Sequence, residues 1–190
     1  MFFECSSLID IKPLENWNVS YCENFERTFF GCSSLADISP SKKWNVSECN
    51  NFVYMFGSCS SLSDIKALES WNVSKGINFT AMFFGCKILS NLKPLKNWNI
   101  TSGKYLGSMF QECISLTDLQ PLQNWNVSNC VNFANMFYGC SSLSDIKPLE
   151  NWNVFNGQAF ERMFYECPSL TEIKPLEKWN VSTNIIFHNK

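Results

Sequence analysis

The chain has 190 residues, of which 45% are hydrophobic and 15% aromatic, so it can form a continuous core and is not disordered. Its 15 basic and 17 acidic residues give a formal net charge of −2, which argues against charge-driven binding of nucleic acid or of an anionic membrane surface. Because no apolar run approaches the ~20 residues of a membrane span, we expect no insertion into a membrane.

A period of 27 residues runs through the sequence. Tryptophan, cysteine and leucine each recur at this spacing without an insertion. An unvarying period predicts a stack of units that bury their apolar side chains against their neighbours. We therefore expect a single solenoid domain over residues 1–190, with about seven repeats and no capping repeats. The three rows are Trp17, Trp44, Trp71, Trp98, Trp125, Trp152 and Trp179; Cys5, Cys32, Cys59, Cys86, Cys113, Cys140 and Cys167; and Leu8, Leu35, Leu62, Leu89, Leu116, Leu143 and Leu170.

Each repeat contains two kinds of local pattern. Residues 133–140 carry apolar side chains at i, i+3, i+4 and i+7, which predicts a short amphipathic helix. Residues 143–146 predict a short parallel strand that ends at Pro148, because proline cannot donate to a ladder. Residues 152–154 are then expected to form the return turn or a second short extended segment. The expected fold class is an α/β repeat, a right-handed leucine-rich-repeat-like solenoid with one short parallel strand and one short helix per 27-residue turn.

Two motifs recur in register along essentially the whole chain. They are Met-Phe-x-Gly/Glu-Cys-x-Ser-Leu-x-x-Ile and, downstream, Trp-Asn-Val-Ser. In these motifs the chain resembles the BspA-like leucine-rich-repeat surface proteins of bacteria and some protists. The resemblance implies a curved solenoid, often on a cell surface, with a role in adhesion and in host or matrix binding. The chain starts without the basic and apolar stretches of a signal peptide, which predicts a cytoplasmic location if it is complete.

The predicted strand provides a candidate binding face. Alternation around an inward row of Ile and Leu turns an acidic row and a lysine row outward. Since the lysine row follows the acidic row by two residues, we expect the opposite charges to neutralise each other. Specificity is expected where the repeats differ, at Asn91, Gln120, Ser39 and Ser41. The candidate face consists of Asp10, Lys12, Asp37, Asp64, Lys66, Asn91, Lys93, Asp118, Gln120, Asp145, Lys147, Glu172 and Lys174.

The cysteines and asparagines each allow two interpretations. The ten cysteines contain no Cys-x-x-Cys pair of the kind that binds zinc, and they predict buried, reduced thiols. Cys22 and Cys49 stand in neighbouring turns, so a disulfide between them is the alternative. The Asn-x-Ser/Thr triplets after Trp mark glycosylation acceptors in a secreted chain. Asn153 keeps the asparagine without the triplet, which favours an amide that bonds the adjacent coil.

No group of reactive residues interrupts the repetition. The lone histidine, His188, lies near the end of the chain, and there is no Gly-rich phosphate loop. We therefore predict no enzymatic activity and no cofactor or metal. The leading hypothesis is a non-catalytic, adhesin-like binding scaffold for protein or glycan partners, and the alternative is a structural spacer solenoid or a fragment of a longer repeat array. The apolar ends, residues 1–3 and 185–187, predict end-to-end self-association.

Overall fold

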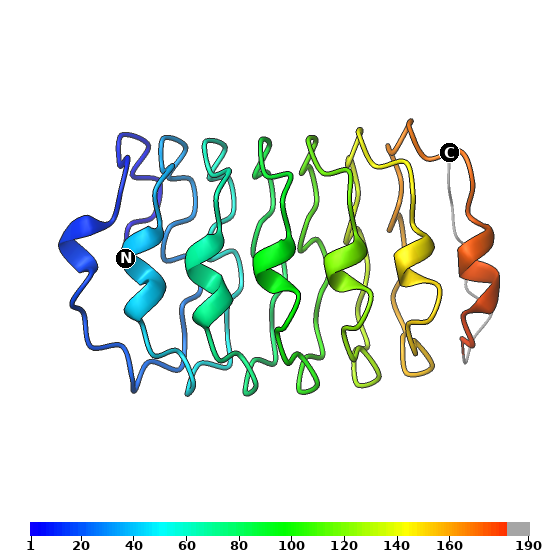
Figure 1. The fold of residues 1–190 in the computed structure, drawn as a ribbon, viewed down its shortest axis with the longest axis horizontal. Helices are drawn as coiled ribbons and strands as arrows, with labels where there is room; N and C mark the ends of the chain where they lie inside the picture. Colours follow the sequence, from blue (N-terminus) through cyan, green and yellow to red (C-terminus); the bar gives the residue numbers. More distant parts are fainter. Residues whose placement is uncertain (182–190) are drawn as a thin grey trace.

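The computed structural model describes residues 1–181 as a stack of parallel coils, each one 27-residue repeat (Figure 1). His188 and the apolar residues 185–187 lie outside the described residues. Within residues 1–181, one short 3-10 helix per coil lies along one side of the stack. The helices are η1 (Lys12–Leu14), η2 (Ser39–Lys43), η3 (Lys66–Ser70), η4 (Lys93–Leu95), η5 (Gln120–Leu122), η6 (Lys147–Leu149) and η7 (Lys174–Lys178).

Backbone hydrogen bonds join the coils along the segment that was predicted to be a helix. The N–H of Phe133 donates to the carbonyl of Ala159 at 2.8 Å, and the N–H of Asn135 donates to Glu161 at 2.9 Å. Every second N–H of this segment therefore points to the next coil, as in a parallel sheet. Isolated parallel bridges accompany these bonds. They are Asn24 with Asn51, Asn51 with Asn78, Asn78 with Tyr105, Tyr105 with Asn132, and Asn132 with Ala159; a further bridge, Asp10 with Asp37, lies in the segment predicted to be a strand.

The predicted helix is wrong, since residues 133–140 form tight turns and no α-helix occurs within residues 1–181. Asn135 and Gly139 have φ angles of 56° and 70°, which a right-handed helix does not contain. The N–H of Met136 donates to the carbonyl of Phe133, three residues back, at 3.1 Å. Two successive turns of this kind place their apolar residues on the inside of an arc. They reproduce the spacing of a helix face without its hydrogen bonds.

The predicted strand is absent from most coils, because residues 143–146 belong to no named strand or bridge. Of its copies, only residues 8–11 and 35–38 are joined by a parallel bridge, between Asp10 and Asp37. The proline row begins the 3-10 helices instead of ending strands. Pro148 lies in the first turn of η6, where its fixed φ suits the helix and its missing N–H removes no bond. The helix closes when the N–H of Leu149 donates to the carbonyl of Ile146 at 3.0 Å.

The inward Ile and Leu row is confirmed in all but its last copy. Ile173 is 43% exposed, whereas the other six members are buried. Those six are Ile11, Ile38, Ile65, Leu92, Leu119 and Ile146.

The tryptophan side chains form hydrogen bonds that join each coil to the preceding one. In six coils the ring is buried, and its indole N–H donates to a backbone carbonyl 30 residues earlier. Trp98 is 5% exposed, and its Nε1 lies 2.9 Å from the carbonyl of Leu68 at the preceding 3-10 helix. The other five bonds run from Trp44 to Leu14, from Trp71 to Ser41, from Trp125 to Leu95, from Trp152 to Leu122 and from Trp179 to Leu149.

Phenylalanine rings and cysteine thiols fill the part of the core that the tryptophan rings do not occupy. Phe110 and Phe137 stack nearly parallel with their ring centroids 5.7 Å apart. The thiol of Cys140 donates to the carbonyl of Phe110 in the preceding coil at 3.1 Å. No buried side-chain nitrogen or oxygen within residues 1–181 lacks a hydrogen-bond partner. The repeated side chains thus satisfy the polar groups of the neighbouring coil while they fill the core.

The first coil differs from the others because no coil precedes it in this chain. Trp17 is 41% exposed, and Met1 and Phe3 are exposed as well. The apolar surface expected at this end is therefore present, but end-to-end association stays a prediction.

We predict that Trp98→Ala lowers the free energy of unfolding by about 3–5 kcal/mol, because it removes a buried aromatic ring. Trp98→Phe keeps most of the packing and isolates the indole hydrogen bond, which contributes about 1 kcal/mol. Urea unfolding measures both losses. Trp17→Ala is the matched control and costs clearly less, since this ring is already partly in solvent; equal losses at Trp17 and Trp98 would contradict the account.

Candidate binding surface

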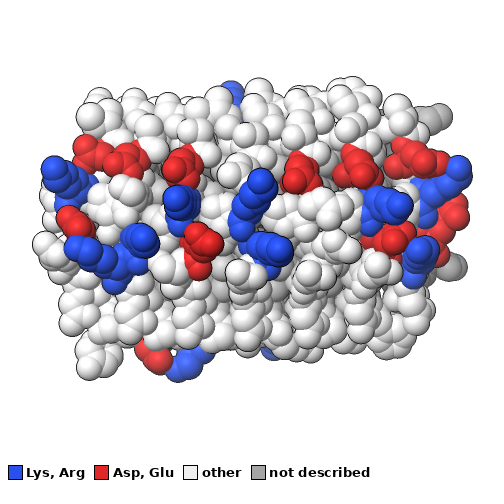
Figure 2. Space-filling model, viewed as in Figure 1, with Lys and Arg blue, Asp and Glu red and all other residues white. Residues whose placement is uncertain are grey.

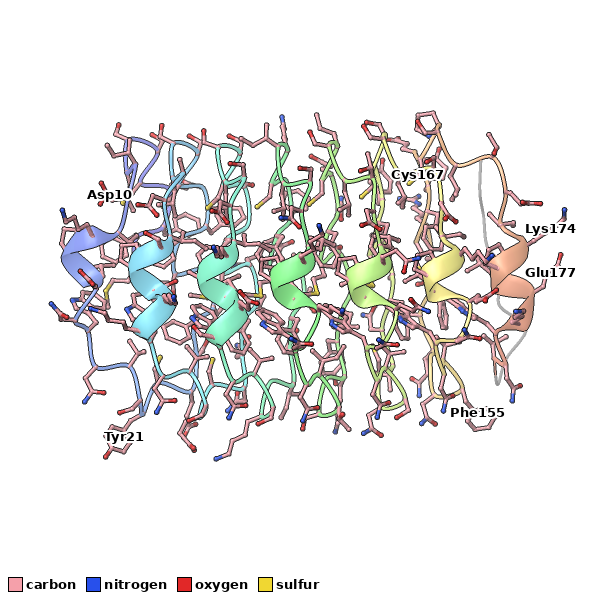
Figure 3. The ribbon with its side chains drawn as sticks, in the orientation of Figure 1. Asp10, Tyr21, Phe155, Cys167, Lys174 and Glu177 are labelled. Atoms are coloured by element: carbon pink, nitrogen blue, oxygen red, sulfur yellow. The ribbon has the colours of Figure 1, made fainter. Side chains whose placement is uncertain are left out.

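The predicted candidate residues lie together along the row of 3-10 helices. We call this surface the 3-10 face; it comprises η1–η7, the residue two positions before each helix and the fourth residue counted from each helix start. Asp10 marks one end of it in Figure 3, and Lys174 and Glu177 of η7 mark the other. Figure 2 shows acidic side chains along one side of this face and lysines next to them. All thirteen candidates are exposed except Asp10, which is half-buried, so the predicted exposure is confirmed. Binding by this face stays a proposal.

The acidic row caps the 3-10 helices. The Oδ1 atom of Asp145 accepts a hydrogen bond from the backbone N–H of Lys147 at 2.7 Å. This N–H is one of the donors that a helix start leaves without a partner inside the helix. The same contact joins Asp64 to the N–H of Lys66 at 2.8 Å. An aspartate makes this contact at the start of η1, η2, η3, η5 and η6.

The expected pairing of acidic and lysine side chains holds only in the last coil. Glu172 and Lys174 form an ion pair at 2.6 Å, with both side chains largely exposed. In the coils with an aspartate, its carboxylate accepts the backbone N–H of the residue two positions later. The remaining ion pair contacts of this face connect neighbouring coils, as between Glu15 and Lys43 at 2.7 Å. Exposed pairs of this type contribute little to stability, so these charges are free to serve recognition.

Sequence reasoning missed a second row of residues on this face, which is charged in six of the seven coils. The row follows the lysine row by three residues, which is one turn of a 3-10 helix. A strand assignment gives no reason to group these positions, whereas a 3-10 period would have done so. The row contains Glu15, Lys42, Glu69, Lys96, Gln123, Glu150 and Glu177.

The positions where the coils differ are not all surface positions. Ser39 and Gln120 are exposed, as expected. Ser41, by contrast, is fully buried, and its hydroxyl donates to the carbonyl of Ile38 at 2.8 Å. It replaces the leucine of the other 3-10 helices and belongs to the core, so its selection as a specificity position is wrong.

The face is hollowed between η3 and η4. This depression has a volume of about 420 Å³ and is open to solvent. Its walls carry two lysines and two carboxylates beside neutral polar groups. It is lined by Ser63, Asp64, Lys66, Glu69, Asn91, Lys93 and Pro94.

The repeats match one family model along nearly the whole chain. The model is described as "Mycoplasma protein of unknown function, DUF285", and it matches residues 1–118 and 89–189. The chain belongs to the DUF285 family. A comparison with curated proteins finds no significant match to this DUF285 chain.

Two solved structures from Listeria monocytogenes show similarity to the DUF285 chain. Internalin C2 is 16% identical, with a TM-score of 0.35 over 77% of this chain and 64% of the internalin. An internalin described as inlF is 15% identical, with a TM-score of 0.23 over 76% of this chain and 61% of that protein. The DUF285 chain thus spans less than two thirds of either internalin.

The asparagines after tryptophan act within their own coil, in contrast to the expected contact with the adjacent coil. The Oδ1 of Asn126 accepts a hydrogen bond from the N–H of Ser128 at 3.2 Å, and Asn153 contacts the N–H of Phe155 in the same way. Such Asx turns need the amide oxygen and not the Ser or Thr of the triplet. This explains why Asn153 occurs without the triplet. Glycosylation of these exposed asparagines stays an open hypothesis.

All ten cysteines of this DUF285 chain are free, and eight are buried. Burial raises the pKa of the Cys86 thiol to about 12, and it raises that of Cys113 well above its usual range. The thiolate is the nucleophilic form, so these side chains are poor nucleophiles at neutral pH. Cys5 is exposed, and Cys22 is half-buried. The prediction of a buried row is therefore wrong for Cys5.

None of the helices within residues 1–181 has the length and hydropathy of a membrane span. The same residues contain no cluster of three His, Cys, Asp or Glu side chains that could hold a metal ion.

We predict that Asp145→Ala lowers the free energy of unfolding by about 1 kcal/mol through loss of the helix cap. Asp145→Asn retains the accepting oxygen and costs much less, because Asn91 makes the same contact in η4 at 3.0 Å. Urea unfolding of the two variants measures the difference. Similar losses for Ala and Asn would show that the charge, and not the cap, is what matters.

We predict that alkylation of the native DUF285 chain at pH 8 labels Cys5 first and Cys22 more slowly. Cys86 and Cys113 are labelled only after unfolding, because burial excludes the reagent and keeps their thiols protonated. Mass spectrometry of peptides from native and urea-treated samples measures the order. Rapid native labelling of Cys86 would contradict the packing of this row.

Proposed function

We propose that this chain is a non-catalytic, adhesin-like binding scaffold that presents its 3-10 face to protein or glycan partners at a cell surface. In this proposal it acts as the BspA-like leucine-rich-repeat proteins do. One observation carries the proposal: apart from the asparagine after tryptophan, which makes an Asx turn, positions that are identical in all coils are largely buried, whereas exposed positions of the 3-10 face differ from coil to coil. The tryptophan row illustrates the first kind. The lysine row illustrates the second, with Ser39 and Gln120 in place of lysine in two coils.

A fixed frame with variable exposed positions suits recognition. The core and coil-to-coil bonds hold the face in one shape, so little conformational entropy is lost on binding. Repeat arrays of this kind offer extended surfaces along the stack, and several weak contacts add up when the partner engages many coils.

A structural spacer, or part of a longer repeat array, is the second candidate function. It is favoured by the recurrence of an acidic residue at the capping position in six of the seven coils. Because the same charges recur from coil to coil, few positions on this face distinguish one coil from another, and a specific partner has little to recognise.

The two candidates differ in whether the 3-10 face binds anything. We expect the labelled chain to bind members of a protein and glycan array saturably, and the variant Lys66→Glu/Gln120→Glu/Lys147→Glu to lose this binding. The control Lys75→Glu/Gln158→Glu/Lys104→Glu makes the same change in charge outside this face and retains it. No saturable binding, or equal loss in both variants, would favour the spacer. Thermal unfolding of each variant verifies that the fold is intact.

A further inference from the structure

Charge is distributed unevenly along the chain. Residues 70–111 contain five of the 15 basic residues and none of the 17 acidic ones. The small net charge of the whole protein therefore hides a basic stretch within an otherwise acidic chain. On the 3-10 face this stretch contributes Lys93 and Lys96, at and directly after η4, and both side chains are exposed.

The acidic row is interrupted in the same coil. Asn91 occupies the capping position, and its Oδ1 accepts the N–H of Lys93 at 3.0 Å, just as Asp64 accepts the N–H of Lys66. The amide keeps the helix cap and removes the negative charge. Figure 2 shows the resulting gap in the acidic row near the middle of the 3-10 face, next to lysine side chains. The exchange therefore alters the electrostatics of the face and leaves its hydrogen bonding unchanged.

No other coil within residues 1–181 combines lysines on this face with the absence of an acidic residue. η2 also carries two lysines, but Asp37 lies in the same coil and Lys43 is paired with Glu15 at 2.7 Å. η5 has exposed glutamines at the two positions that are lysine in η4. Lysines without an acidic residue in their own coil are thus confined to the coil of η4. Lys93 lines the depression beside η4 together with Lys66, Asp64 and Glu69 of the preceding coil.

Acidic side chains flank this positive site on both sides. Asp64 and Glu69 lie in the preceding coil and Asp118 in the following one, and all three are exposed. Neighbouring coils are about 5 Å apart, as in any parallel ladder. This spacing is shorter than the Debye length of about 8 Å at physiological salt, so a bound anion experiences the flanking carboxylates as well.

From this pattern we infer that the surface of η4 binds a protein segment with an acidic centre and neutral or basic flanks. The inference rests on the proposed scaffold function and specifies its partner. A uniform polyanion, such as a sulfated glycan or an anionic bilayer, would place negative charge against Asp64, Glu69 and Asp118 as well. A peptide can alternate its charges, so that its acidic residue meets Lys93 and Lys96 while its basic residues meet the flanking carboxylates.

The chain supplies its own conservative substitutions for a test. Asn91→Asp restores the residue that caps the neighbouring helices and adds a negative charge at the site. Lys93→Gln/Lys96→Gln introduces the side chains that η5 already carries at these positions. Lys87→Gln/Lys104→Gln makes the same charge change outside the 3-10 face. Because all these side chains already occur in this fold or are exposed, each variant is expected to unfold at the temperature of the parent chain.

The experiment selects peptides from a displayed library of random linear sequences on the immobilised 190-residue chain. We expect enriched peptides with an acidic centre, and we expect both η4 variants to weaken their binding by about tenfold or more, with the control variant unchanged. Their affinity should also fall with rising salt.

Three outcomes would overturn the inference. They are enrichment of peptides without acidic residues, affinities that the η4 variants leave unchanged, and preferential binding of heparin or anionic vesicles. If enriched peptides lose affinity only with Lys66→Glu/Gln120→Glu/Lys147→Glu, the 3-10 face is a binding surface but η4 does not specify it. If neither set of variants affects binding, the proposed function fails together with the inference.

Discussion

The hydrogen bond from each buried indole to a carbonyl of the preceding coil holds the structure together. It spans 30 residues and recurs at 2.9–3.0 Å in six coils. The carbonyl that it reaches belongs to a 3-10 helix and also accepts the backbone N–H of the tryptophan in its own coil, as Leu68 does from Trp71 at 3.1 Å. A single residue type thus fills the core and sets the register between coils. The unvarying period of 27 residues follows, because an insertion would separate the indole from its acceptor.

This arrangement separates stability from recognition. The groups that join the coils are buried, and the side chains of the 3-10 face make only local contacts with their own helix starts or exposed ion pairs. Substitution at such exposed positions costs little free energy of unfolding. The exchange of aspartate for Asn91 illustrates this freedom, since the cap persists while the charge changes. A binding surface can therefore vary on a constant frame.

The candidate face was predictable because exposure follows from position within the repeat. The acidic and lysine rows alternate with the inward Ile and Leu row, and this alternation holds in the 3-10 geometry as well as in the assumed strand. The roles of these residues were less predictable. Asp145 contacts a backbone N–H and not the lysine side chain, and Ser41 is buried. Both facts depend on the path of the backbone, which the spacing of residue types does not specify.

The sequence by itself determined the period, the stacked architecture and nearly all the residues of the core. These follow from apolar residues that recur at fixed spacing, since each coil has only its neighbours to pack against. Only the tertiary structure decided which secondary structure each segment adopts. Residues 133–140 have the spacing of a helix, yet their N–H groups bond the next coil and Asn135 adopts a left-handed conformation. A short segment forms too few internal hydrogen bonds to be a stable helix, so bonds between coils, invisible in one repeat, determine its structure.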